Sequence, residues 1–89
     1  MSADNVHAVH FSLSADASPG LLSRLLEPFA RRDLIPDEVA ARCSGAVMEV
    51  EIAVQMPAEM LPYVQGNLRQ VIGLRMLACN VMEPRALAA

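Results

Sequence analysis

Two stretches with apolar residues at every second position constrain this chain more than any other feature. In residues 6–15 the odd positions from Val9 to Ala15 are apolar and the even positions between them are polar. In residues 46–56 the even positions from Met48 to Met56 are all apolar. A period of two puts alternate side chains on opposite faces of a β-strand, so both stretches predict strands with one buried face.

The second stretch also predicts a β-hairpin with residues 35–43, joined by the turn pair Ser44-Gly45. The predicted register places Cys43 opposite Ala46 and keeps this offset along both strands, so that the apolar side chains of both strands share one face. Arg42 is then diagonal to a glutamate of the other strand. The polar face carries Arg42, Glu49, Glu51 and Gln55.

The turn in residues 16–20 leads into a first amphipathic helix. Ser18 suits the N-cap and Pro19 the first helical position. Pro28 removes a backbone N–H from the helix interior, which predicts a kink there and an end near Asp33. The apolar stripe of this helix comprises Leu21, Leu22, Leu25, Leu26 and Phe29.

A second helix is predicted in residues 58–71, where apolar residues recur at helical spacing, and residues 73–81 predict a nearly all-apolar final strand. The order of elements is that of the split βαβ, or ferredoxin-like βαββαβ, layout. Right-handed crossovers place both helices on one face of a four-stranded antiparallel sheet, which is an α+β fold. We predict one domain over residues 6–81 and a loose C-terminal tail over residues 82–89.

Composition favours a protein that covers apolar surface with a partner. Hydrophobic residues make up 54 % of the 89 residues, and a domain this small leaves much of that surface uncovered, which favours a homodimer. Seven basic and ten acidic residues give a net charge of −3, and there is no Trp, so nucleic acid is not the expected partner. No stretch could span a membrane and the start lacks signal-peptide features, so we expect a cytoplasmic protein without membrane contact.

The sequence holds no recognisable constellation for catalysis. His7 and His10 are three residues apart on a predicted strand, so they point to opposite faces and cannot share a metal ion. Cys43 and Cys79 lack a CxxC partner and are predicted to be buried thiols. An acylphosphatase-type enzyme would need an arginine in the loop before the first helix, and that loop has none. We therefore expect no catalytic residue, no metal site and no cofactor.

The loop before the first helix contains groups that suit a small charged ligand. Free amide groups near Gly20 and Leu21 suit a carboxylate, and Asp16 or Ser18 could hold an ammonium group. The alternative is that the loop only starts the helix, which leaves Gly20 unexplained. The candidate effector-binding residues are Asp16, Ala17, Ser18, Gly20 and Leu21.

Residues 13–34 resemble the first half of an ACT domain, and in particular the small regulatory subunit of acetohydroxyacid synthase, also called acetolactate synthase. The segments that carry the resemblance are Ser18-Pro19-Gly20-Leu21-Leu22-Ser23-Arg24 and Phe29-Ala30-Arg31-Arg32. The similarity continues to the last helix and strand, through Val64-Gln65-Gly66-Asn67-Leu68-Arg69-Gln70-Val71-Ile72-Gly73-Leu74, and covers roughly residues 6–81.

The resemblance implies a short, single-domain regulatory subunit that is not itself an enzyme. Subunits of this type stabilise and activate a large, thiamine-diphosphate-dependent catalytic subunit in branched-chain amino acid biosynthesis. The resemblance also implies side-by-side pairing of two domains into one eight-stranded sheet, with branched-chain amino acid effectors near the loop before the first helix. Relatives often carry Asn where this chain has Ala17, and the neighbouring Asp16 would repel an effector carboxylate. The alternative function is a free-standing ACT-like amino-acid sensor that acts on another protein.

Overall fold

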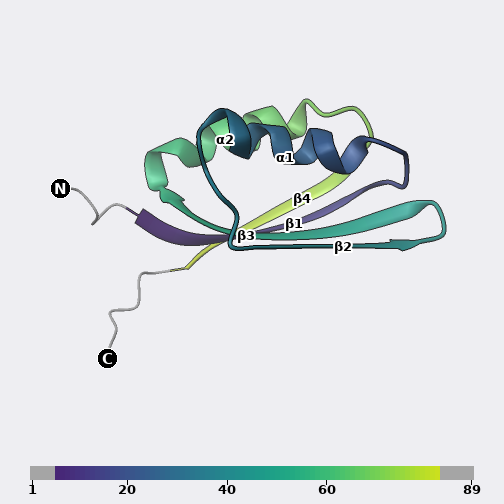
Figure 1. The fold of residues 1–89 in the computed structure, drawn as a ribbon, viewed down its shortest axis with the longest axis horizontal. Helices are drawn as coiled ribbons and strands as arrows, with labels where there is room; N and C mark the ends of the chain where they lie inside the picture. Colours follow the sequence, from purple (N-terminus) through teal and green to yellow (C-terminus); the bar gives the residue numbers. More distant parts are fainter. Residues whose placement is uncertain (1–5, 83–89) are drawn as a thin grey trace.

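The computed structural model describes residues 6–82. The elements are β1 (Val6–Asp16), α1 (Leu21–Arg31), β2 (Glu38–Ser44), β3 (Val47–Pro57), the 3-10 turn η2 (Ala58–Met60), α2 (Leu61–Arg69) and β4 (Leu74–Met82). The strands form one antiparallel sheet in the order β2-β3-β1-β4, and both helices cover the same face of it (Figure 1). This confirms the predicted α+β, ferredoxin-like fold. Met82 ends β4, and the rest of the predicted tail lies outside the described residues.

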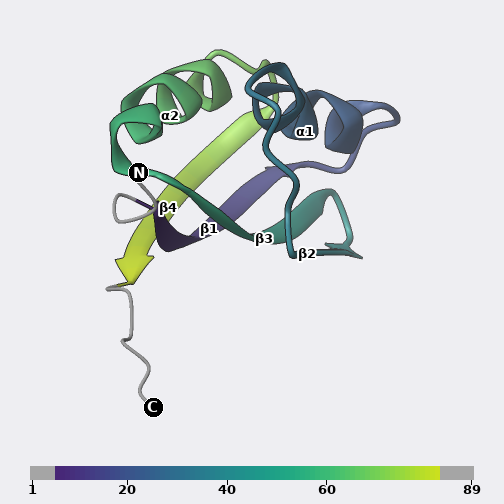
Figure 2. The same cartoon turned by 60° about the vertical axis from the view of Figure 1, so that its left-hand side comes forward.

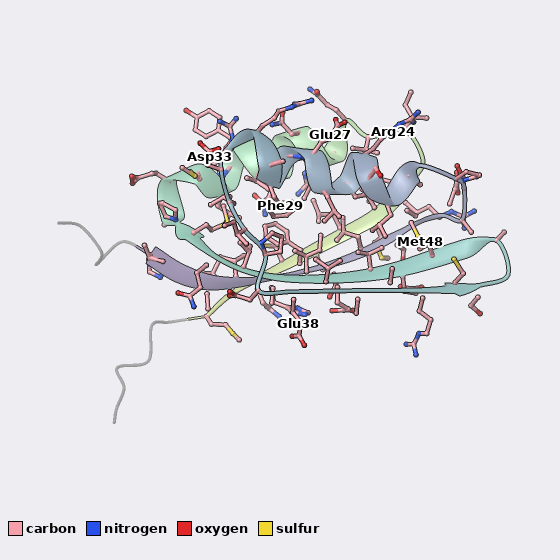
Figure 3. The ribbon with its side chains drawn as sticks, viewed as in Figure 1. Arg24, Glu27, Phe29, Asp33, Glu38 and Met48 are labelled. Atoms are coloured by element: carbon pink, nitrogen blue, oxygen red, sulfur yellow. The ribbon has the colours of Figure 1, made fainter. Side chains whose placement is uncertain are left out.

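The core lies between the helices and the covered face of the sheet. The apolar positions of the two alternating stretches are buried as predicted, from Val9 to Ala15 in β1 and from Met48 to Met56 in β3. Phe29 points from α1 toward the sheet (Figure 3) and meets Phe11 with ring centroids 5.2 Å apart and planes at 84°. This edge-to-face pair fixes α1 over the middle of β1. The helices contribute Leu21, Leu25, Phe29, Val64 and Leu68 to the core.

The hairpin of β2 and β3 differs from the prediction in register and in burial. Cys43 pairs with Met48 rather than with Ala46, because the turn is formed by Gly45 and Ala46. The pairing shifts by two residues, which preserves the face on which each side chain lies. However, β2 is an edge strand and all of its residues are exposed, Cys43 among them. The prediction of a buried Cys43 is therefore wrong, because no helix covers the edge strand.

The helices end close to where the sequence predicts. α1 continues through Pro28 to Arg31. Asp33, the predicted end, has a φ of 58° and adopts the left-handed conformation in which a helix cannot continue. The second helix begins as the 3-10 turn η2 and then continues as α2, with Gln70 as its C-cap.

The open face of the sheet is mostly polar on β1 and β3, whereas β4 adds Met76 and Ala78 to it. Ser12 of β1 donates to Glu51 of β3 at 3.1 Å, and Ser14 donates to Glu49 at 3.0 Å. Arg42 of β2 lies directly opposite Glu49 in the register instead of diagonal to it. The side chains of Glu49 and Glu51 on β3 thus form their hydrogen bonds with β1, the neighbouring strand on the side away from β2.

Candidate functional site

A tight turn joins β1 to α1 and sets where the helix begins. The N–H of Leu21 donates to the carbonyl of Ser18 at 3.2 Å, and Gly20 has φ 81° and ψ −9°. A four-residue turn with proline second and a left-handed glycine third is a type II turn. α1 therefore begins at Leu21 with Gly20 as its N-cap. The predictions that Ser18 caps the helix and that Pro19 is its first residue are wrong, and the turn supplies the reason for Gly20.

Two backbone hydrogen bonds fix the base of this loop. The N–H of Asp16 donates to the carbonyl of Gly73 at 2.9 Å, and the N–H of Ala17 donates to the carbonyl of Ala46, also at 2.9 Å. The loop is thus bonded on one side to the residue before β4 and on the other to the turn between β2 and β3. Both contacts lie at the end of the sheet where α1 begins (Figure 1).

An ion pair adds a third contact between the loop and β4. Nε of Arg75 donates to Oδ1 of Asp16 at 2.7 Å, and both side chains are half-exposed. The guanidinium offsets the carboxylate charge, so Asp16 repels a ligand carboxylate less than the sequence alone implies. Arg75 was not among the candidate residues. Its signal in the sequence is that it is the single charged residue in residues 73–81.

Gly73 allows the chain before β4 to approach the loop closely. Its φ is 106°, and a Cβ atom at this position would lie 3.0 Å from Cδ2 of Leu21 and 3.7 Å from Oδ2 of Asp16. An L side chain would be strained here and would press on both neighbours. Gly73 was also missed, although a glycine at the start of an apolar strand is a recognised sign of close backbone approach.

The loop offers backbone donors rather than a pocket of side chains. Ala17, Ser18, Pro19 and Gly20 are exposed, whereas the side chain of Leu21 is buried in the core. The N–H of Leu21 is taken by the turn. In the described part of the chain, no backbone hydrogen bond is donated by the N–H groups of three nearby residues, which are Gly20, Leu22 and Ser23. Three such donors at a helix start, where the helix dipole is positive, suit a carboxylate.

The remaining chemistry-bearing residues are dispersed. His10 lies on the open face with Nε2 at 2.9 Å from Glu51, while His7 pairs in register with the buried Met56 on the other side. Burial raises the pKa of the Cys79 thiol, and a hydrogen bond with Gln65 offsets part of that rise. No group of three His, Cys, Asp or Glu in residues 6–82 is arranged to hold a metal ion. Nor is any helix in this range long and apolar enough to cross a membrane.

Known proteins share this arrangement at low sequence identity. A family profile described as an ACT-like domain matches residues 2–73, and no curated protein sequence matches the chain. The ACT domain from GTP pyrophosphokinase of Chlorobium tepidum superposes with a TM-score of 0.74 at 9 % identity, covering 84 % of this chain and 99 % of that one.

Two structures of larger proteins contain the same fold. A homoserine dehydrogenase from Thiobacillus denitrificans gives a TM-score of 0.75 at 10 % identity over 93 % of this chain, which corresponds to 19 % of the dehydrogenase. A structure of aspartokinase alpha and beta subunits gives 0.64 at 14 % identity, over 82 % of this chain and 49 % of that one. At these identities the likeness establishes the fold.

Proposed function

The chain belongs to the ACT-like domain family, and from this membership we propose that it is a non-catalytic regulatory subunit that binds an amino acid and acts on a partner enzyme. ACT domains are typically regulatory modules that bind small molecules such as amino acids. In this proposal the regulatory domain spans residues 6–81 and works in the cytoplasm.

The observation that carries the proposal is the set of free N–H groups at the start of α1. Gly20, Leu22 and Ser23 present donors at the positive end of the helix dipole, beside a loop that two backbone bonds hold in place. Asp16 and Arg75 next to them form an acid–base pair. An amino acid carries the matching charges, because its carboxylate suits the N–H groups and its ammonium group suits the half-exposed carboxylate of Asp16.

We propose the catalytic subunit of acetohydroxyacid synthase as the partner enzyme, with valine, leucine or isoleucine as the effector. The support is the resemblance of residues 13–34, and of the segment from Val64 to Leu74, to the small subunit of that synthase. Ala17 replaces the asparagine that many relatives carry. Backbone N–H groups and the exposed Ser18 hydroxyl are left to hold the effector, which predicts weaker binding than an asparagine side chain would give.

We also propose that two copies pair side by side through their β2 strands into one eight-stranded sheet. The support is that β2 is at the edge of the sheet with all seven residues exposed. The exposed residues include Val39, which is 40 % exposed, on the strand itself and Ile35, which is 84 % exposed, just before it. An uncovered edge strand with apolar side chains is the surface that strand pairing buries.

The experiment that tests the partner is reconstitution with the purified catalytic subunit of acetohydroxyacid synthase from the same organism. The two proteins are mixed at micromolar concentrations, and the molar mass of the mixture is measured by light scattering after size exclusion. A complex of defined stoichiometry supports the proposal. Two separate peaks would remove the synthase as partner.

The alternative function, a free-standing amino-acid sensor, is separated by a thermal-shift screen of the twenty amino acids. Stabilisation by an amino acid without association with the synthase favours the sensor. Stabilisation by valine, leucine or isoleucine together with association favours the regulatory subunit.

A further inference from the structure

A groove runs between α1 and α2 on the side of the helices away from the sheet. The two helices lie side by side over the sheet in both ribbon views (Figures 1 and 2). The groove encloses about 290 Å³, and its lining includes Arg24, Glu27 and Arg31 from α1 and Asn67 from α2, with Ile72 following α2. Figure 3 shows Arg24 and Glu27 on the outer side of α1. This groove is separate from the loop between β1 and α1.

The groove exists because the helices use their apolar side chains to bind the sheet and not each other. Leu25 and Phe29 of α1 and Val64 and Leu68 of α2 are buried in the core. The positions facing outward between the helices are mostly polar, with guanidinium groups on the wall formed by α1 and the amide groups of Asn67 and Gln70 on the other wall. Polar walls of this kind are solvated in the free chain and present hydrogen-bond donors to whatever covers them.

The outer surface of the helices carries an excess of positive charge. Residues 21–33 and 58–72 hold four arginines against two glutamates and one aspartate, a net charge of +1 in a chain whose net charge is −3. Glu27 is 3.5 Å from Arg31, at the ordinary spacing of neighbouring helical turns, and both side chains are exposed. Arg24 forms no ion pair within residues 6–82. The end of the groove at Arg24 is therefore the end with an unmatched cation.

Large apolar side chains stand exposed near the two ends of the groove. Ile72 is 86 % exposed at the end near Arg24. Tyr63, near the start of α2, is 62 % exposed, and its ring lies 5.0 Å from the guanidinium carbon of Arg32. Tyrosine and arginine are the residue types that most often dominate the binding energy of protein interfaces. Exposed apolar residues around an arginine without an ion pair mark a surface for an acidic, partly apolar ligand.

We propose that this groove binds an acidic segment of the partner protein, with a carboxylate on Arg24 and apolar side chains on Ile72 and Tyr63. The inference rests on the proposed function, because the partner is the catalytic subunit proposed above. A second copy of this chain is a poorer occupant. It would bring the same excess of arginine to a two-fold contact, where like charges face each other.

The test measures the affinity of the catalytic subunit for this chain and for three variants by isothermal titration calorimetry. Arg24→Glu reverses the unmatched charge, and Ile72→Ser removes the exposed apolar anchor. Arg69→Glu is the matched control, because it makes the same charge change on α2 at an exposed position that does not line the groove. Circular dichroism and thermal melting of each variant confirm that the fold is kept.

We expect Arg24→Glu to weaken binding by about tenfold or more and Ile72→Ser by about fivefold, while Arg69→Glu changes it by about threefold or less. The affinity of the wild-type chain should also fall with added salt, and the affinity of Arg24→Glu should fall less. Equal losses for Arg24→Glu and Arg69→Glu would overturn the proposal, because the charge would then act diffusely.

Other results separate the inference from the proposed function. If the wild-type chain binds the catalytic subunit and both Arg24→Glu and Ile72→Ser bind it with the same affinity, the groove is not the binding site. The proposed function then stands. No association of the wild-type chain overturns both. Light scattering of this protein without the catalytic subunit gives its oligomeric state. If Arg24→Glu changes that molar mass, the groove binds a second copy of this chain, and the proposal that it binds the partner protein is overturned.

Discussion

Arg75 donates from Nε to Oδ1 of Asp16 at 2.7 Å, and this bond connects the start of β4 to the end of β1 beside the loop that precedes α1. The N–H of Asp16 is bonded to the carbonyl of Gly73, so the side chain of Asp16 holds β4 and its backbone holds the residue just before β4. The proposed effector loop is thereby coupled to β4, and the predictions below begin from this contact.

Arg75→Gln should weaken amino-acid binding while changing stability little. The ion pair is half-exposed, so its loss costs about 0–1 kcal/mol. Without the guanidinium, the Asp16 carboxylate is no longer held in position for the ammonium group of the effector, and its full charge repels the effector carboxylate more strongly. Calorimetric titration with valine, leucine and isoleucine checks the affinity, and thermal melting checks the stability. Arg42→Gln on β2 is the control, and an equal loss of affinity in both variants would contradict the role given to Arg75.

Gly73→Ala should destabilise the fold by roughly 1–3 kcal/mol, because alanine is strained at a φ of 106°. Its Cβ would also contact Leu21 at 3.0 Å. Gly66→Ala in α2 is the matched control, since a Cβ there meets nothing within 4 Å, and it should stabilise by about 0.5–1 kcal/mol. Urea unfolding gives both values. A neutral Gly73→Ala would show that the loop and β4 are not tightly packed.

The sequence predicts the layers of this fold well, because alternation and helical spacing are local patterns. They place Phe11 of β1 and Phe29 of α1 on the faces that meet in the core. The hairpin register was wrong by two residues, because Ser44-Gly45 and Gly45-Ala46 are both plausible turns. Which strand lies at the sheet edge depends on the crossovers, so the exposure of Cys43 does not follow from its own neighbours in sequence.

The sequence points to the loop at residues 16–20 as a candidate site, and it does not point to the residues that hold this loop in place. Local turn signals direct attention to residues 16–20, and the structure shows that Gly20 is needed for the turn. Arg75 and Gly73 come from the far end of the chain and reach the loop only through the pairing of β1 with β4. No sequence pattern near Asp16 predicts its contacts with Arg75 and Gly73. Tertiary pairing of distant segments is the information that single-sequence periodicity lacks.

The core pair predicts a large effect of a single substitution. Phe29→Ala should destabilise the fold by about 3–5 kcal/mol, because the side chain is 1 % exposed and leaves a cavity beside Phe11. Tyr63→Ala removes a comparable aromatic ring from the surface and should change stability by less than about 1 kcal/mol. Denaturant titrations of both variants test this. Similar losses in the two would mean that the core is not centred on the phenylalanine pair.

The two thiols should differ in reactivity and in its pH dependence. Cys43 is exposed, whereas burial raises the pKa of Cys79. A raised pKa leaves less thiolate at a given pH, and the thiolate is the reactive form. Cys43 should therefore react first with a thiol reagent near neutral pH, and the rate of Cys79 should keep rising into the alkaline range. Mass spectrometry after timed alkylation identifies the site, with Cys43→Ser as the control.

The same reagent tests the proposed pairing of β2 strands. If two copies pair through β2, the labelling rate of Cys43 should fall as protein concentration rises through the dimer dissociation constant. The rate of Cys79 should stay constant as the internal control. A Cys43 rate that is independent of concentration, in a sample that light scattering shows to be dimeric, would place the dimer interface elsewhere.

The catalytic rate of the acetohydroxyacid synthase catalytic subunit, titrated with this chain in the presence and absence of valine, tests the central claim most directly. We predict a rate that rises and saturates at a fixed ratio of the two chains, as expected for a non-catalytic subunit that activates its partner. In the activated complex, valine should lower the rate only weakly because of Ala17. A rate that stays at the level of the catalytic subunit alone across the whole titration would contradict the account.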